Sequence, residues 1–336
     1  MYIFQQFLLA LGGITLFLIG LKYMSENMEN LAGNRMKNLL QGFTKNKYAG
    51  VLTGAVSTAV IQSSIATNII VVGFVSNGIM TFLQASSVIM GANIGTTMTA
   101  QLVSLSGKEA FDITAIGALS SFVGFILSFL KKKNLNYVGG VMMGFGMLFL
   151  GLDIIGEAVS FFKNFEEFRN IFLVKNDLWL LLNGLLVTAV VQSSSAVTSV
   201  MIILASNGLL DFESSIFLIL GSNIGTCLSV IVASLGKSVE ARRTAFFNLA
   251  FNVVGSVVLF LPLTLFKSQI ASWFMSFSGG IERQIANFHT LFNLFVTIIL
   301  LPVLKPFTDL ITLIIKDGKP KRKKSKLKVS IRVKNA

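Results

Sequence analysis

The sequence contains few of the residues on which most enzymes and cross-linked domains depend. Its 336 residues include a single cysteine, Cys227, and a single histidine, His289. One cysteine excludes an intramolecular disulfide and a metal cluster built from cysteines. The apolar segments hold almost no ionisable residues, so the paired carboxylates or metal-ligand sets that a membrane enzyme needs are missing. We therefore expect no enzymatic activity.

Charged residues are scarce as well. They make up 13% of the chain, whereas a soluble domain of ordinary composition has about a quarter. Hydrophobic residues account for 53%, the mean hydropathy is +0.75, and there are 30 phenylalanines but only four prolines. Such long apolar helices are typical of proteins immersed in lipid. The sequence predicts an all-α polytopic membrane protein of the cytoplasmic membrane, with a first helix at 3–21 that is not a cleaved signal.

The formal net charge of +13 is concentrated at the end of the chain. Residues 316–334 hold ten of the 28 lysines and arginines and one acid, Asp317. A basic run directly after an apolar helix is typical of a cytoplasmic tail that contacts anionic lipid. Nucleic acid is not an expected partner, because no nucleic-acid-binding module accompanies these charges. We expect 316–336 to be such a tail.

A duplication is the most informative feature of the sequence. Residues 52–96 align with 182–226 without a gap, and 19 of the 45 positions are identical. The identical positions include Gln-Ser-Ser at 62–64 and 192–194, and Asn-Ile-Gly-Thr at 93–96 and 223–226. The chain therefore contains two copies of one unit, each of which carries both motifs at the same spacing.

Apolar spans predict how each copy crosses the membrane. The segments 49–76 and 179–206 are each interrupted by Gln-Ser-Ser, which favours re-entrant helical hairpins with the motif at the tip. Full crossings are predicted near 3–22, 82–105, 113–130, 136–156, 212–234, 243–266 and 286–304. Three crossings per copy is an odd number, so the second copy is expected to be inverted relative to the first.

This topology divides the chain into parts. Repeat 1 is expected at 1–135, repeat 2 at 136–266, a final transmembrane helix at 267–315, and the tail beyond it. Interfacial helices are expected at 28–47 and 157–177. With the C-terminus cytoplasmic and the N-terminus outside, 21 lysines and arginines fall inside and six outside, as the positive-inside rule requires. An oligomer is compatible with this arrangement.

The Gln-Ser-Ser motifs have the chemistry of an oxyanion site. Amides and hydroxyls donate hydrogen bonds, and the helix that follows each motif presents free backbone N–H groups and its positive dipole end. Two inverted tips would hold a tetrahedral anion from both sides. The predicted anion ligands are the following: Gln62, Ser63, Ser64, Gln192, Ser193, Ser194 and Ser195. The alternative is that the serines only allow close helix packing.

The Gly-x-Asn-Ile-Gly-Thr motifs at 91–96 and 221–226 suggest a cation site. Two glycines four residues apart weaken a helix, and freed carbonyls with asparagine and threonine oxygens suit Na⁺. Asn93, Thr96, Asn223 and Thr226 are the candidate ligands. The alternative is a packing seam of small residues. Asn-Gly at 77–78 and 207–208 is expected to end each hairpin as a cap, and His289 is more typical of a structural histidine than of a proton relay.

At these motifs the sequence resembles the type II sodium/phosphate cotransporter family over roughly residues 5–300. The resemblance implies co-transport of Na⁺ with divalent phosphate and adds Thr198, with Asn68 at the matching place in repeat 1, to the sodium candidates. Ile65 replaces the third serine of the first motif, whereas Ser195 keeps it in the second. The family's acidic segment after the first repeat is not recognisable at 114–124, so the resemblance leaves the ion ratio open.

These features predict sodium-coupled symport of inorganic phosphate by alternating access, with the substrate between the two tips. Inorganic phosphate and Na⁺, the co-transported ion, are the expected ligands, and the protein itself is expected in a lipid bilayer. One alternative is a sodium- or proton-coupled transporter of another oxyanion, such as sulfate or a carboxylate. A passive anion channel is a second alternative.

Overall fold

The computed structural model describes residues 2–42, 46–107, 112–172 and 175–316, and all regular structure in these ranges is helical. The predicted all-α class is confirmed, and the tail beyond residue 316 lies outside the described residues. The α-helices are α1 (Tyr2–Gly42), α2 (Lys47–Ile61), α3 (Ser64–Ser76), α4 (Phe82–Thr96), α5 (Met98–Val103), α6 (Ile113–Ser128), α7 (Lys133–Phe162), α8 (Glu166–Phe172), α9 (Asp177–Val191), α10 (Ser194–Ser206), α11 (Phe212–Ser234), α12 (Val239–Leu265), α13 (Lys267–Ser278), α14 (Ile281–Leu300) and α15 (Leu304–Ile314).

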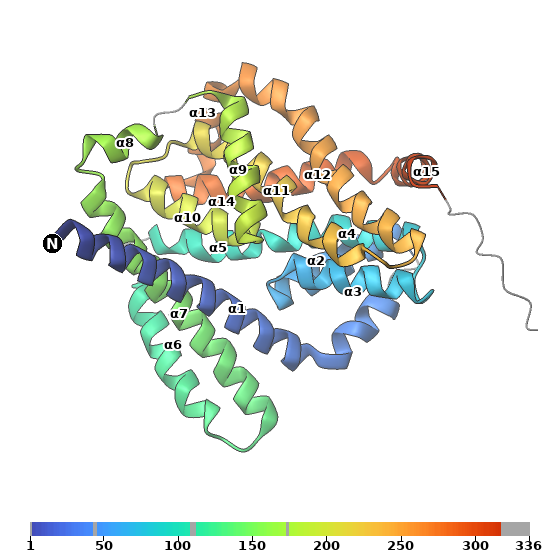
Figure 1. Cartoon of the computed structure of the whole chain (residues 1–336), viewed down its shortest axis with the longest axis horizontal. Coiled ribbons are helices and arrows are strands. Elements are labelled where there is room, and N and C mark those ends of the chain that lie inside the picture. The colour runs from blue at the N-terminus through green and yellow to red at the C-terminus, as the bar shows by residue number, and fades with distance from the viewer. Residues whose placement is uncertain (1, 43–45, 108–111, 173–174, 317–336) are drawn as a thin grey trace, which may run out of the picture.

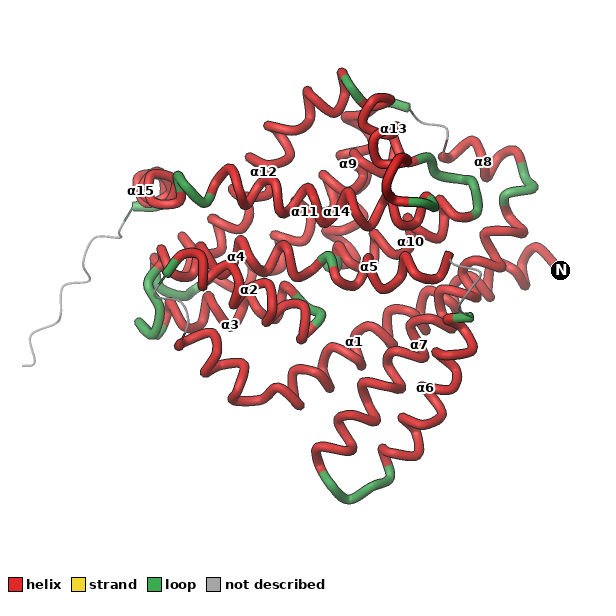
Figure 2. Tube along the Cα trace, turned by 180° about the vertical axis from the view of Figure 1, so that it is seen from behind, coloured by secondary structure: helices red, strands yellow, loops and turns green. Residues whose placement is uncertain are grey.

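Four of these helices, α1, α7, α11 and α12, are long and apolar enough to cross a membrane. Two bent pairs, α8 with α9 and α14 with α15, raise the number to six if each pair forms one span. The sequence predicted seven crossings. The predicted span 82–105 is divided between α4 and α5 (Figure 2), because the Thr97 hydroxyl and amide both bond the Ile94 carbonyl, at 2.8 and 3.1 Å, and tighten the chain there.

The predicted crossing at 3–22 and interfacial helix at 28–47 form one continuous helix, α1, up to Gly33 (Figure 1). The sequence between them contains no proline or glycine, and Lys22 and Glu26 pair one turn apart at 3.7 Å. The helical geometry is interrupted at Gly33, where φ is 49°. In the second predicted interfacial segment, 157–177, α7 continues to Phe162 and α8 is a separate short helix.

Both predicted hairpins are pairs of short helices interrupted at Gln-Ser-Ser. The chain leaves α2 at Gln62 and enters α3 after Ser63, and it leaves α9 at Gln192 and enters α10 after Ser193. Gly78 and Gly208 end the second helix of each pair with φ of 71° and 76°, as the Asn-Gly pairs predicted.

Glycines bring the neighbouring helices close together. A Cβ at Gly91 would overlap the Val51 carbonyl oxygen of α2, and one at Gly221 would overlap the Leu181 carbonyl oxygen of α9. The prediction that the glycines unwind the helix at 221–226 is wrong, since α11 is continuous across them. The glycines are used for close packing, as the alternative stated.

The remaining helices surround these pairs. In Figure 1, α6 and α7 form a hairpin that extends away from the rest, and α1 packs along α7. The segment 267–315, expected to provide the final transmembrane helix, contains three helices, α13, α14 and α15, and α14 meets α15 at a bend of 85°. The predicted crossing at 286–304 corresponds to α14.

The glycine contacts make a stability prediction. Gly221→Ala places a methyl group against a backbone oxygen that cannot move independently of its helix, so we expect it to destabilise the protein by about 1–3 kcal/mol. Gly73→Ala is the matched control, because a Cβ there meets no heavy atom within 4 Å and alanine favours the helix. Thermal unfolding in detergent measures both. Equal melting temperatures for the two variants would contradict the packing role.

Candidate functional site

The two motif glutamines have an unusual backbone conformation. Gln62 and Gln192 both have φ of 59°, and they are the only non-glycine residues with positive φ in the described ranges. Each amide N–H bonds a carbonyl four residues back, of Thr58 or Thr188, at 2.7 Å. The left-handed region costs a residue with a Cβ about 1–2 kcal/mol. Glutamine at a position that glycine occupies more easily indicates that its side chain has a function.

The serine that follows each glutamine caps the next helix. Ser63 Oγ accepts from the Ala66 amide and Ser193 Oγ from the Ala196 amide, each at 3.2 Å. The first amides of α3 and α10 have no intrahelical acceptor and form the positive end of a helix dipole. Each tip therefore presents hydroxyls and N–H groups together, as a site for an oxyanion does.

Both tips line one cavity of about 520 Å³. The motif residues in its wall are Gln62, Ser63, Ser64, Gln192, Ser193, Ser194 and Ser195. Thr226 of α11 lines it too. Segments 130 residues apart in sequence thus share one polar cavity. All seven residues that the sequence indicated for the anion are brought together there.

The cavity also has a wall that sequence analysis missed, on α1. Lys22, Ser25, Glu26 and Glu29 lie on one face of this helix because they are three or four residues apart. The Ser25 hydroxyl donates to the Ile61 carbonyl at 2.8 Å, which links α1 to the first tip. The regular spacing of these polar residues beyond the first apolar run was the signal that could have found them. One ammonium and two carboxylates give this wall a net charge of −1.

The two tips differ in their hydrogen bonds. Gln62 Oε1 accepts from Thr99 Oγ1 at 2.8 Å, whereas the side chain of Gln192 is exposed and bonds no described residue. Ser195 Oγ donates to the Thr96 carbonyl at 3.3 Å, and its counterpart Ile65 has no hydroxyl. Ser64 and Ser194 are alike, since both line the cavity and neither hydroxyl has a hydrogen-bond partner among the described residues. The second tip therefore has more free polar groups.

The other residues predicted to bind sodium do not line this cavity. Asn68 and Thr198 are buried on α3 and α10, and Asn68 Oδ1 and Thr198 Oγ1 have no partner among the described residues. Thr96 reaches the second tip only through its carbonyl, which accepts from Ser195. Of the six candidates, only Thr226 is in the cavity wall.

Asn93 and Asn223 instead belong to a buried polar cluster between α4, α11, α12 and α14. Asn93 Nδ2 donates to Asn248 Oδ1 at 3.2 Å, and Asn252 Nδ2 donates to Asn93 Oδ1 at 3.1 Å. His289 is fully buried, with Nε2 3.1 Å from Asn223 Oδ1. The asparagines of α12 were not predicted, although their spacing of four residues in an apolar span places them on one helix face.

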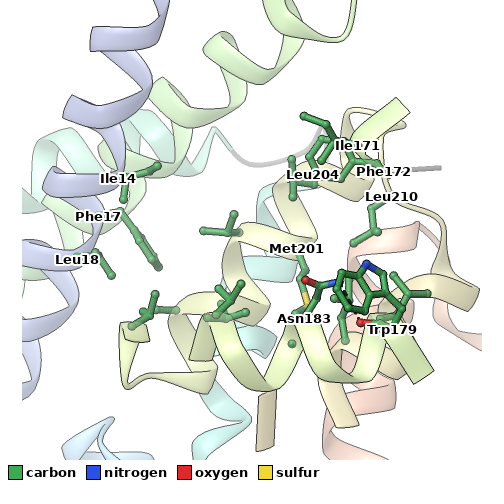
Figure 3. Close-up of a pocket in the computed structure, with 18 residues that line it drawn as sticks. Ile14, Phe17, Leu18, Ile171, Phe172, Trp179, Asn183, Met201, Leu204 and Leu210 are labelled. Atoms are coloured by element: carbon green, nitrogen blue, oxygen red, sulfur yellow. Dashed lines mark hydrogen bonds between the residues drawn. The ribbon is translucent and has the colours of Figure 1, made fainter. Parts of the chain in front are cut away.

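A second cavity, of about 510 Å³, adjoins the polar one (Figure 3). Side chains of α1, including Ile14 and Phe17, face Met201 and Trp179 of the second hairpin across it. Leu18 and Val191 line both cavities. Its wall is almost entirely apolar, which does not suit an anion.

The fold and its apolar helices define a multi-pass helical membrane protein. The family model described as Na⁺/Pi-cotransporter matches residues 16–157 and 165–279, and the chain belongs to this family.

Three relatives indicate the range of the family. "Uncharacterized protein YqeW" of Bacillus subtilis is 28% identical over 304 residues, which cover 90% of this chain and 96% of that protein. "Putative inorganic phosphate export protein YjbB" of Escherichia coli is 26% identical over 311 residues, covering 91% and 55%. "Sodium-dependent phosphate transport protein 2A" of Rattus norvegicus is 35% identical over 133 residues, covering 37% and 21%. The chain thus spans about half the length of the export protein. No solved structure matches it.

The left-handed backbone at Gln192 predicts that this residue lowers the stability of the fold. Gln192→Gly removes the cost of the left-handed conformation, so we expect it to be more stable than the wild type by about 1 kcal/mol. Gln192→Ala keeps that cost and loses no hydrogen bond, so its melting temperature should match the wild type. Gln62→Ala is the contrasting variant, because it loses the bond from Thr99 and should be less stable. A Gln192→Gly protein that melts below the wild type would refute this account.

Proposed function

We propose that this protein carries inorganic phosphate across the cytoplasmic membrane in symport with Na⁺. The observation that supports this most directly is that both Gln-Ser-Ser tips line a single polar cavity. The family and the names of two relatives, a phosphate exporter and a sodium-dependent phosphate transporter, agree with the cargo. The direction of net transport follows from the ion and phosphate gradients.

A tetrahedral dianion needs many donors, because removing it from water without hydrogen bonds is costly. The two tips offer side-chain amides, hydroxyls and first-turn amides from opposite repeats. The hydroxyls of Ser64 and Ser194 are equally free. The second tip has the freer amide, since the side chain of Gln192 has no partner among the described residues, whereas Gln62 bonds Thr99 and Ala59. We therefore assign the larger share of anion binding to the second repeat. Ser195, which stands where the first repeat has Ile65, joins when its hydroxyl hydrogen turns from the Thr96 carbonyl to the anion.

The charges of the cavity wall favour a co-transported cation, and the proposal assigns this role to Na⁺. Lys22 is the only basic residue among the described residues that line the cavity, and it is already paired with Glu26. Phosphate would add two negative charges to a wall of net charge −1, so cations must enter with it. Thr226 lies in the wall, and the unpartnered oxygens of Asn68 and Thr198 suit Na⁺ near the tips. Asn93, Thr96 and Asn223 remain candidates in the helices behind them.

Alternating access follows from two inverted repeats, 1–135 and 136–266, in a chain with its N-terminus outside. In support, α2 packs on α4 through Gly91 and Gly95, and α9 packs on α11 in the same way through Gly221 and Gly225. The α2–α4 and α9–α11 pairs are then two rigid units built in the same way on either side of the cavity. Movement of one pair relative to the other exposes the cavity to either side of the membrane.

The transport claim is tested with purified protein in proteoliposomes. An inward Na⁺ gradient should drive accumulation of labelled phosphate, and dissipating the gradient should abolish it. Gln192→Ala and Ser194→Ala should each lower uptake at least tenfold, because they remove cavity donors that bond nothing else described. Gln269→Ala and Ser272→Ala on the exposed face of α13 are matched controls that should transport normally.

Competing anions and gradients distinguish the alternatives. Stronger inhibition of labelled uptake by sulfate or a carboxylate than by unlabelled phosphate would assign a different oxyanion. Accumulation driven by a proton gradient in the absence of Na⁺ would show that the coupling ion is H⁺ rather than Na⁺. Equilibration without accumulation under any gradient would indicate a passive channel and exclude symport.

The proposed orientation predicts which side of the membrane each loop reaches. In a Cys227→Ala background, Ser276→Cys should react with an impermeant maleimide on intact cells, because α13 is expected outside. Lys132→Cys, in the exposed turn between α6 and α7, should react only after the cells are opened. Labelling of the residue-132 cysteine in intact cells, or of both sites equally, would be incompatible with this orientation.

A further inference from the structure

The two motif glutamines have equivalent neighbours that are used differently. Gln62 Oε1 accepts a hydrogen bond from Thr99 Oγ1 at 2.8 Å. When the ungapped alignment of the repeats is extended by three residues, Thr99 corresponds to Ser229, which also carries a hydroxyl. Ser229 Oγ is buried and has no hydrogen-bond partner among the described residues. Gln192, the counterpart of Gln62, likewise bonds no described residue through its side chain.

The helices that hold these residues pack in the same way up to the motif. An added Cβ at Gly95 would lie 2.8 Å from Thr58 Cβ and 3.0 Å from the Ala59 amide. At Gly225 the corresponding distances are 2.9 Å to Thr188 Cβ and 3.0 Å to the Ala189 amide. The α2–α4 and α9–α11 contacts are therefore alike at this point, and each hydroxyl follows four residues later in the chain.

The repeats diverge directly after these glycines. In the first, α4 ends and α5 begins at Met98, with a turn at Thr97 between them. In the second, α11 continues through Cys227, the counterpart of Thr97. The turn at Thr97 lies two residues before Thr99, whose hydroxyl bonds Gln62. The unbroken helix leaves Ser229 buried without a partner.

We propose that Thr99 and Ser229 are positioning residues for the two motif glutamines, and that each bond forms in only one of the two transport states. In the state described here, Thr99 holds Gln62. When the second repeat adopts the conformation that the first has here, Ser229 donates to Gln192 Oε1 and Thr99 releases Gln62. This inference rests on the proposed function, because it requires two repeats that exchange conformations.

The chemistry explains why a hydroxyl is needed at both positions. A glutamine side chain has an oxygen that repels an anion and an N–H group that binds it. A hydroxyl that donates to the oxygen removes the acceptor from the anion and leaves an amide hydrogen to face it. Gln62 Nε2 donates one hydrogen to the Ala59 carbonyl, so its second hydrogen is available for this purpose. Valine or alanine in place of the hydroxyl loses this orientation without changing the motif itself.

Transport kinetics test the roles one side at a time. Thr99→Val and Ser229→Ala should each raise the KM for phosphate about three- to tenfold, the effect of one hydrogen bond, with a smaller change in maximal rate. The two effects should appear on opposite faces of the membrane, measured in right-side-out and inside-out vesicles. Thr99→Ser and Ser229→Thr keep a hydroxyl, so their KM for phosphate should stay within about twofold of the wild-type value. Unchanged KM values on both faces for Ser229→Ala would overturn the proposal.

Thermal unfolding in detergent provides a readout that does not depend on transport. Thr99→Val should lower the melting temperature of the wild type but not that of Gln62→Ala protein, because the bond is already lost there. Ser229→Ala should leave the melting temperature unchanged in the state described here, where its hydroxyl bonds no described residue, and should lower it only when Na⁺ and phosphate favour the opposite state. A Ser229→Ala protein that melts at the wild-type temperature with and without these ligands would refute the exchange. Absence of phosphate transport by the wild type would instead refute the proposed function alone.

Discussion

A helix that is interrupted inside a membrane leaves backbone amides and carbonyls without partners, and lipid cannot satisfy them. The site depends on how the chain meets this constraint twice. Gln62 and Gln192 turn into the left-handed region and return their amides to the preceding helix, and Ser63 and Ser193 cap the helix that follows. The amides that remain in the first turns of α3 and α10 have no intrahelical acceptor. Because these groups border a cavity, a polar ligand is the natural means of satisfying them.

Rigid supports keep the tips in place. Glycines allow α2 to approach α4, and α9 to approach α11, until backbone oxygens lie where a Cβ would be. Interiors packed at this density do not deform gradually, so any movement is of whole helix pairs. This shared packing does not extend to the whole of the two repeats. The equivalence extends through Gly95 and Gly225 and is lost at Thr97, where a hydroxyl competes for a backbone carbonyl and the helix is interrupted.

The duplication in the sequence predicts one part of this architecture correctly. Two copies of Gln-Ser-Ser at one spacing predicted the broken helices and the residues that meet in the cavity, because a polar motif in an apolar segment has few structural uses. The prediction from the sequence was wrong where one residue type has two structural uses. Glycines can loosen a helix or allow close packing, and only the position of α9 shows that Gly221 does the latter. It also missed Glu26 and Glu29, because charged residues at the end of an apolar helix resemble an interfacial boundary until the partner helices are known.

The charges of the cavity explain why two ligands would be bound together. Wall residues from α1 contribute a net charge of −1, and the helix ends contribute partial positive charge of limited range. Phosphate alone would make the cavity strongly negative, whereas Na⁺ alone would lack the anion that balances several cations. If the proposed function holds, each ligand would raise the affinity of the other, and by linkage the two effects would be equal. A site of this kind would be found mainly in two forms, empty or with both ligands bound. A transporter whose repeats move only in these two forms carries the two ligands together, which is coupled transport.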